Sequence, residues 1–107
     1  MIYELRTYEA HEGRGEPMRR RFKEHVVPRL PKHGIELLGV FEPQDDEGRL
    51  VYVTRFADED ARQKGWAAFG ADPEWKAIKA ESEKDGPLLR NQTVVVMNPA
   101  VEGLLMG

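Results

Sequence analysis

Residues 35–56 of this chain, IELLGVFEPQDDEGRLVYVTRF, contain two apolar runs on either side of a polar stretch. The runs 35–42 and 49–56 are rich in the β-branched and aromatic residues that favour strands. The segment between them carries the proline, aspartates and glycine of a turn, so the pattern predicts an antiparallel hairpin. Large apolar side chains occupy both faces of this hairpin, and we expect something besides the chain's own helices to cover one face.

The segment before the hairpin predicts a strand followed by a helix. Residues 2–8 (IYELRTY) are rich in strand-forming types, and over residues 16–32 apolar side chains recur at every fourth position, as in an amphipathic helix. Two prolines near the end of this helix remove backbone donors, which predicts a kink or a looser turn near Val27. Gly34 is expected to end the helix in the left-handed conformation.

The segment after the hairpin predicts two helices and a last strand. Asp58 is a helix-capping residue before an apolar periodic stretch, and Asp72, followed by proline, opens a second short helix. Residues 88–97 (LLRNQTVVVM) predict the final strand. The resulting order of strand, helix, strand, strand, helix, strand predicts a ferredoxin-like split β-α-β domain of the α+β class. We expect one domain over residues 1–107, with a tail at 98–107.

Composition excludes several kinds of function. The 107 residues suit one domain with one core, and the net charge of -3 is spread along the chain, which does not favour nucleic-acid binding. The basic run at residues 19–23 is interpreted as a solvated helix face. No cysteine is present, and no stretch approaches the roughly 18 apolar residues of a membrane span. We therefore expect a cytoplasmic protein with neither a membrane nor a nucleic acid as partner.

The predicted architecture also has a consequence for assembly. A four-stranded antiparallel sheet with its helices on one face leaves the other face bare, and the hairpin's second apolar face lies there. A standard interface buries about 800 Å² per partner, which is the scale of such a face. The pattern predicts a homodimer packed sheet to sheet.

Five segments of the chain together resemble the NIPSNAP family. These segments are YELRTY at 3–8, KHGIELLGVFEP at 32–43, LVYVTRFAD at 50–58, ARQKGWAAFGADPEW at 61–75 and GPLLRNQ at 86–92. The resemblance covers nearly the whole chain and implies the dimeric α+β barrel architecture, in which two ferredoxin-like units pack sheet to sheet. It implies no single reaction, because relatives include cofactor-free monooxygenases, haem-degrading enzymes, isomerases, dehydratases and proteins without known chemistry.

The resemblance also implies a small-molecule pocket between the sheet and the helices, and two residues are candidates for catalysis there. His25 lies at the edge of the first helix's apolar stripe and could act as a general acid or base. The alternative is a boundary histidine bonded to a carbonyl. Arg6 could hold a carboxylate or enolate oxygen by a two-pronged bond. The alternative is an ion pair of Glu4 with Arg6 or Arg55 at the dimer interface.

Five further residues are candidates for contacting a bound molecule. They are two tyrosines, one arginine and two tryptophans: Tyr3, Tyr52, Arg55, Trp66 and Trp75. The tryptophans have the spacing of helix residues that face a sheet, so a place in the core is their alternative interpretation. The alternative for the tyrosines is a place in the dimer interface. No metal site is expected, because the three histidines are scattered, and His33 is interpreted as a partner of the first helix's last carbonyls. No nucleotide-binding loop is present either.

Two functions stay open at this point. The first is a homodimer that binds or transforms a small apolar or aromatic organic molecule without a metal or nucleotide cofactor. If it is an enzyme, the reaction expected is that of a cofactor-independent monooxygenase or isomerase. The second is a non-catalytic interaction or dimerisation domain, in which the dimer itself or the tail Leu104-Leu105-Met106 is the functional surface.

Overall fold

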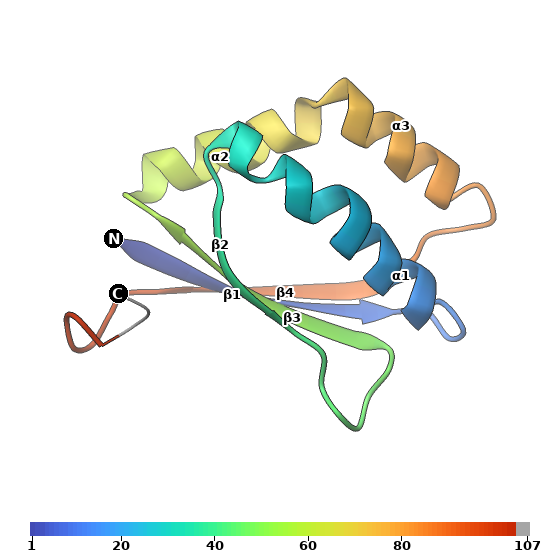
Figure 1. The fold of residues 1–107 in the computed structure, drawn as a ribbon, viewed down its shortest axis with the longest axis horizontal. Helices are drawn as coiled ribbons and strands as arrows, with labels where there is room; N and C mark the ends of the chain where they lie inside the picture. The colour runs from blue at the N-terminus through green and yellow to red at the C-terminus, as the bar shows by residue number, and fades with distance from the viewer. Residues whose placement is uncertain (105–107) are drawn as a thin grey trace.

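A computed structural model describes residues 1–104 and confirms the predicted order of elements. The elements are β1 (Ile2–Ala10), α1 (Gly15–Arg21), η1 (Phe22–Val26), η2 (Val27–Arg29), η3 (Pro31–His33), β2 (Glu36–Phe41), β3 (Arg49–Phe56), α2 (Glu59–Ala71), α3 (Pro73–Ser82) and β4 (Leu89–Met97). The four strands form one antiparallel sheet in the order β2-β3-β1-β4, which is the ferredoxin-like topology. Figure 1 shows the helices gathered on one side of this sheet. In the described part of the chain, none of the helices is long and apolar enough to cross a membrane.

The first helical region loosens where its prolines predict that it should. After α1, the backbone N–H of Val27 donates to the carbonyl of Phe22, which widens the turn by one residue. Pro28 and Pro31 have no N–H to continue the helical ladder, and the chain passes through the two short tight turns η2 and η3. Gly34 ends the region with φ of 73°, in the left-handed conformation that a residue with a Cβ disfavours.

The two later helices begin at the predicted aspartates. Asp58 accepts a hydrogen bond from the backbone of Ala61 at 2.8 Å, and Asp72 accepts from Glu74 at 2.8 Å and from Trp75 at 3.2 Å. The second cap is also tied to the first helical region, because Asp72 Oδ2 lies 2.8 Å from His33 Nε2.

The side chain of His33 therefore has a different partner from the predicted one, which was the last carbonyls of the first helix. It bonds a side chain on another helix, and this bond, with the two backbone N–H groups, lowers the pKa of Asp72. The contact joins the end of η3 to the start of α3, which are 39 residues apart in the sequence. Such a partner can be placed only once the tertiary fold is known.

The core lies between the sheet and the helices. Its fully buried side chains include Leu30 and Ile35 from the first helical region and its exit, and Leu50 and Tyr52 from β3. α2 approaches closely at Gly65, where an added Cβ would lie 3.0 Å from the Cγ1 of Ile35. This close approach brings α2 down onto the start of β2 and the end of β3, next to the site described below.

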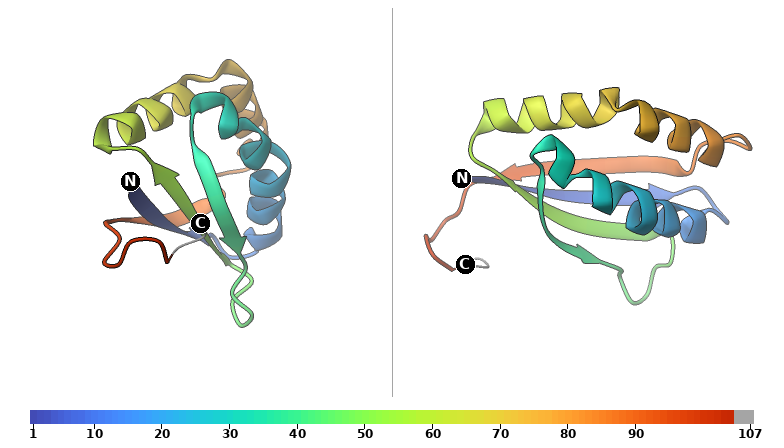
Figure 2. Two further views of the ribbon diagram at one scale, coloured as in Figure 1. Left: turned by 60° about the vertical axis from the view of Figure 1, so that its left-hand side comes forward. Right: turned by 45° about the horizontal axis from the view of Figure 1, so that its top comes forward.

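No helix covers the opposite face of the sheet (Figure 2). Apolar side chains occupy this face. Strand register places Leu5 between Val53 and Val95 in one row across the sheet, and the next row contains Val51 and Phe41. Phe41 is 55% exposed and Val95 is 47% exposed. We call this surface the open face.

Ion pairs flank the apolar rows of the open face. Arg55 and Glu36 pair across β3 and β2 at one end of the sheet, with their closest N and O atoms 2.5 Å apart. Arg49 and Glu9 pair across β3 and β1 at the other end at 2.7 Å. The face therefore has an apolar centre between two charged margins.

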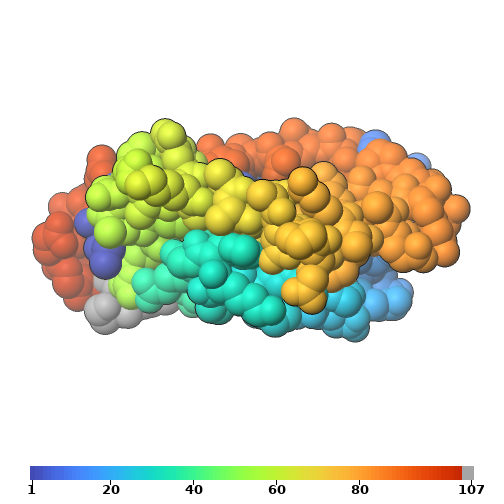
Figure 3. Space-filling model, turned by 90° about the horizontal axis from the view of Figure 1, so that it is seen from above, coloured from blue at the N-terminus to red at the C-terminus, as the bar shows by residue number. Residues whose placement is uncertain are grey.

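The edge strand β4 is exposed on both of its faces. Its side chains alternate between the open face and the helix side, and Val94 and Val96 on the helix side are 40% and 45% exposed. Viewed from above the helices, β4 extends past the rim of the helical layer (Figure 3). Long apolar edge strands of this kind favour association with another chain.

Candidate functional site

A cavity of about 200 Å³ lies between the sheet and the helices. Aromatic rings from β1, η1, α2 and α3 form most of its wall: Tyr8, Phe22, Trp66, Phe69 and Trp75. Its polar lining consists of Arg6, Arg21, Lys79 and Gln92. The Phe69 ring lies 5.8 Å from Trp66 and 5.0 Å from Trp75, between centroids, so the three rings form one continuous wall. We call this space the aromatic cavity.

Strand alternation explains why Arg6 reaches this cavity. Residues at even positions of β1 face the helices, so Glu4, Arg6 and Tyr8 are directed there. Two charged residues on that side of a central strand require partners. Glu4 and Arg6 are partners of one another. Arg6 donates from Nε and Nη2 to the two carboxylate oxygens of Glu4, each at 3.0 Å.

Glu4 is fully buried and collects hydrogen bonds from two elements besides its own. Thr54 on β3 donates at 2.7 Å, Arg62 on α2 at 2.8 Å, and the indole N–H of Trp66 on α2 at 2.9 Å. Burial opposes the charged form, but these bonds and those from Arg6 outweigh it and lower the pKa of Glu4 to about 2. The carboxylate thereby joins β1, β3 and α2 and holds the Trp66 wall in place. We call these bonded side chains the Glu4 network.

Arg6 is held by its aromatic neighbour as well as by Glu4. Its guanidinium carbon lies 4.0 Å from the centroid of the Trp66 ring, a cation–π arrangement. Burial lowers the pKa of Arg6, but the Glu4 carboxylate overcomes this effect and raises it, so the residue is a permanent cation. A rigid cation stacked on an aromatic wall can bind a ligand's oxygen, but it cannot exchange protons near neutral pH.

Two tyrosines meet at the inner end of the cavity. The hydroxyl oxygens of Tyr8 and Tyr52 lie 2.7 Å apart, and the Tyr8 ring packs edge-on against Phe22 and Tyr52. Tyr52 is completely buried and does not line the cavity, whereas Tyr8 does. Burial raises the pKa of both hydroxyls, which therefore remain protonated at neutral pH.

The basic run at residues 19–23 is only partly the solvated face that the sequence predicts. Arg20 and Lys23 are exposed, but the side chain of Arg21 is only 8% exposed and lines the aromatic cavity. Its Nη1 donates to Glu83 at 2.7 Å and to Ser82 at 3.0 Å. The interpretation is wrong for Arg21 because α3 and the turn after it pack on that side of α1.

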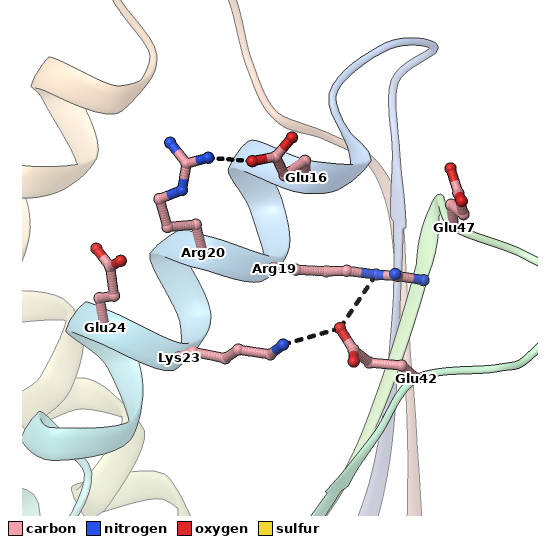
Figure 4. A pocket seen from close by; sticks show the side chains of 7 residues that line it. All are labelled: Glu16, Arg19, Arg20, Lys23, Glu24, Glu42 and Glu47. Carbon is pink, nitrogen blue, oxygen red and sulfur yellow. Dashed lines mark hydrogen bonds and ion pairs between the residues drawn. The ribbon is translucent and has the colours of Figure 1, made fainter.

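The exposed members of the run belong to a charged groove of about 490 Å³ between α1 and the β2–β3 loop. Figure 4 shows its seven side chains, of which four are carboxylates and three are cations. Arg20 pairs with Glu16, and Glu42 accepts from both Arg19 and Lys23. Because Arg19 and Lys23 both pair with Glu42, these ion pairs hold the first helical region against the loop, and the groove's four carboxylates outnumber its three cations.

The sequence-predicted residues do not all meet at the aromatic cavity. Arg6, Trp66 and Trp75 line it. Tyr3 and Arg55 lie on the open face because they occupy the alternate positions of their strands, so neither of them lines the aromatic cavity. The Glu4–Arg6 pair exists, but on the helix side of the sheet, and Arg55 bonds Glu36 instead.

His25 also lies away from the aromatic cavity. It lines a separate groove of about 500 Å³ on the outer surface between the first helical region and α3, beside Pro17 and Ile78. Met18, Phe22, Val26 and Leu30 are all buried as their four-residue spacing predicts, and His25 lies beside this buried stripe, on the side of η1 that faces the outer groove. Its expected place in the pocket between the sheet and the helices is corrected accordingly.

Four residues of the site were absent from the sequence-based candidates: Arg21, Arg62, Lys79 and Gln92. Arg62 could have been predicted from the sequence, because it precedes Trp66 by four positions and the two residues share one helix face. A buried Glu4 needs cationic partners, and Arg62 is the arginine of that face. The other three depend on how α1, α3 and β4 pack together. Residues 1–104 contain no group of three histidine, aspartate or glutamate side chains that could hold a metal ion.

The strand order and the single helical layer define a ferredoxin-like subunit, the building unit of dimeric α+β barrel proteins. The family model of NIPSNAP matches residues 3–101, so the chain belongs to the NIPSNAP family. Among curated proteins, none matches the sequence.

Solved structures with similar folds agree with this assignment. Protein Atu4242 from Agrobacterium tumefaciens, described as a NIPSNAP family protein of unknown function, is 26% identical with a TM-score of 0.82, over 99% of this chain and 100% of that chain. A NIPSNAP domain protein from Burkholderia xenovorans is 20% identical with a TM-score of 0.78, over 95% and 97% of the two chains. An antibiotic biosynthesis monooxygenase is 16% identical with a TM-score of 0.67, over 94% and 100%. The last two likenesses concern the fold alone.

The depressed pKa of Glu4 predicts a loss of stability in acid. Its folded-state value of about 2 is below the ordinary 4.5, so its contribution is complete above pH 4.5 and disappears as the pH falls through 2. The shift corresponds to about 3 kcal/mol of unfolding free energy. Urea unfolding at pH 7, 4.5, 3 and 2 measures the loss, and a Glu4→Gln variant isolates it from other carboxylates. Parallel pH profiles of the two proteins would contradict the assignment.

Proposed function

We propose that this NIPSNAP protein binds a small aromatic or apolar organic molecule in the aromatic cavity, without a metal or nucleotide cofactor. The observation that carries the proposal is the cavity itself, which places an arginine against a wall of three aromatic rings. Small-molecule sites are mostly apolar hollows with a few oriented polar groups, and the aromatic cavity has this composition.

The volume of the cavity limits the size of the molecule. Ligand pockets commonly reach about 300–1,000 Å³, whereas a dry cavity of about 150 Å³ is enough for benzene. At about 200 Å³, the aromatic cavity suits one ring with a small substituent. We propose single-ring compounds as its ligands and expect fused-ring compounds to bind less well.

The chemistry available in the cavity favours binding and orientation of a ligand oxygen. Arg6 is a permanent cation that can stabilise a carboxylate or an enolate, and Tyr8 can donate a hydroxyl hydrogen bond. A structural neighbour described as an antibiotic biosynthesis monooxygenase makes oxidation of a bound organic molecule one reaction to assay, by analogy of fold alone. The alternative is a non-catalytic interaction domain. The exposed valines of β4 and Leu104, which is 77% exposed, favour that alternative, while Leu105 and Met106 of the tail lie outside the described residues.

Binding can be tested with the chain's own fluorescence. Trp66 and Trp75 are the only tryptophans in the sequence and both line the cavity, so a ligand there changes the emission of both. We expect single-ring compounds to change the emission and to raise the unfolding temperature; a ligand at 100 times its Kd stabilises a fold by about 2.7 kcal/mol. Naphthalene derivatives should give smaller responses.

A matched pair of variants locates the binding site. Gln92→Phe places a ring at the wall of the cavity, and Val96→Phe places one on the same side of the same strand but away from it. The first variant should weaken binding while the second retains it. If no single-ring compound changes the fluorescence or the unfolding temperature, the non-catalytic alternative is favoured.

We also propose that two copies of the chain pack through their open faces. The apolar rows around Leu5 and Val53, with ion pairs at both margins, resemble the apolar core and polar rim of a protein interface. The exposure of Phe41 and Val95 supports this proposal, because a lone copy would leave them in water. An interface of about 800 Å² per copy would be of standard size.

A further inference from the structure

We propose that the molecule bound in the aromatic cavity is an anion: a single-ring acid whose carboxylate or enolate oxygen contacts Arg6, Arg21 and the hydroxyl of Tyr8. The inference deepens the proposed function and rests on it, since it assigns a charge to the ligand of the same cavity. Three observations carry it: the charge of the lining, the unused donors of its arginines and the orientation of the tyrosine pair.

The lining of the cavity is positively charged. Arg6, Arg21 and Lys79 line it, and its described lining contains no carboxylate. The nearby carboxylates are bound elsewhere, since Glu4 pairs with Arg6 and Arg62, Glu59 with Arg62, and Glu83 with Arg21. These four cations and three carboxylates leave one positive charge in excess. A ligand with a single negative charge would balance it, whereas a cation would add to it.

Both arginines keep donors that the described residues leave unused. Arg6 engages Nε and Nη2 with Glu4, and the hydrogen bonds among residues 1–104 do not involve its Nη1. Arg21 engages Nη1 with Ser82 and Glu83, and the same bonds do not involve its Nη2. A largely buried guanidinium gains most from a charged oxygen acceptor, which accepts stronger hydrogen bonds than a neutral carbonyl.

The tyrosine pair supplies a third donor. Tyr52 is completely buried, and its hydroxyl has the Tyr8 hydroxyl as its hydrogen-bond partner. If Tyr52 donates, its own proton is satisfied and the proton of Tyr8 is free to point into the cavity; the reverse arrangement leaves a buried donor without a partner. Arg6, Arg21 and Tyr8 all line the same small cavity, so the three groups can contact one ligand there.

Lys79 adds a charge that is easily removed. It lies on the exposed side of α3 at the wall of the cavity, and no ion pair within residues 1–104 includes its ammonium group. Lys76, three residues earlier on α3, is also exposed but does not line the cavity. The two lysines therefore provide a matched test of the charge effect without disturbing the core.

The test compares two probes of nearly the same shape, benzoate and benzamide, by tryptophan fluorescence and calorimetry at pH 7. We expect benzoate to bind at least about tenfold more tightly, because one hydrogen bond to a charged group can supply that factor. Lys79→Met should weaken benzoate binding by about threefold and should leave benzamide unchanged, while Lys76→Met should affect neither. Tyr8→Phe should also reduce the preference for benzoate, whereas Tyr52→Phe leaves the cavity hydroxyl in place and should retain it.

The possible results separate two questions: whether the cavity selects an anion, and whether it binds a ligand at all. If benzamide binds as tightly as benzoate, the ligand is not selected as an anion and the inference is overturned, while the proposed function stands. Equal effects of Lys79→Met and Lys76→Met would overturn it as well, because the preference would then reflect overall charge. If neither probe binds at millimolar concentration and the wild-type protein is folded, the proposed function is overturned together with the inference.

Discussion

Replacing Glu4 by glutamine is expected to cost about 3–5 kcal/mol of unfolding free energy, the range observed when one partner of a buried ion pair is removed. The amide can still accept hydrogen bonds on one oxygen, but its NH2 group would face the donors of Arg6 or Arg62. Two partly buried guanidiniums would then lose their shared carboxylate. Urea unfolding followed by circular dichroism measures the change, and the loss is a large part of the 5–15 kcal/mol of a typical domain.

Glu36→Gln is the matched control for this prediction. Glu36 also accepts two bonds from one arginine, Arg55, but it is exposed on the open face, where water screens the pair. Its replacement should cost less than about 1 kcal/mol. Equal losses for the two variants would show that burial of Glu4 does not decide its contribution.

A Val95→Asp substitution is expected to convert the proposed dimer into a monomer. Val95 lies in the central apolar row of the open face and is 47% exposed in a single copy, so the aspartate would disturb the isolated fold little. In a sheet-to-sheet dimer the same carboxylate would be buried in each copy without a partner. Light scattering should give a mass near 12.2 kDa for the variant, against twice that value for the unmodified chain.

An aspartate placed elsewhere controls for the added charge. Ala68 lies on the exposed surface of α2, in the helical layer on the other side of the sheet from the open face. Ala68→Asp should therefore leave the dimer intact. A monomeric mass for the unmodified chain at micromolar concentration would contradict the assembly itself. Dissociation by both substitutions would point to an interface outside the open face.

Much of the fold can be predicted because short-range patterns agree with long-range packing. Alternation along YELRTY places Glu4, Arg6 and Tyr8 on one side of β1, and the side that the helices cover then receives all three. The tryptophans of the later helices face the sheet as their spacing predicts, and they line the cavity rather than fill it. Gly34 and the capping aspartates act through local geometry, which the sequence encodes directly.

The rest of the site could not be predicted because it depends on angles between elements. Whether Arg21 is buried is decided by the approach of α3, and nothing near residue 21 encodes that contact. His25 was placed at the edge of the apolar stripe, and whether such an edge residue faces the cavity or the outer groove depends on how α3 packs beside the first helical region. Tyr3 and Arg55 were assigned to the pocket by residue type, although strand alternation already places them on the other face.

The Glu4 network ties down only one wall of the cavity. Its hydrogen bonds reach β1, β3 and α2, whereas Trp75 on α3 and Gln92 on β4 take no part in them. The residues of the wall formed by α3 and β4 could therefore be varied to bind other molecules, while the hydrogen bonds of the Glu4 network on the anchored side keep the fold intact. Trp66 on the anchored side would remain in every member of such a library and would report binding by its own fluorescence, without any attached dye.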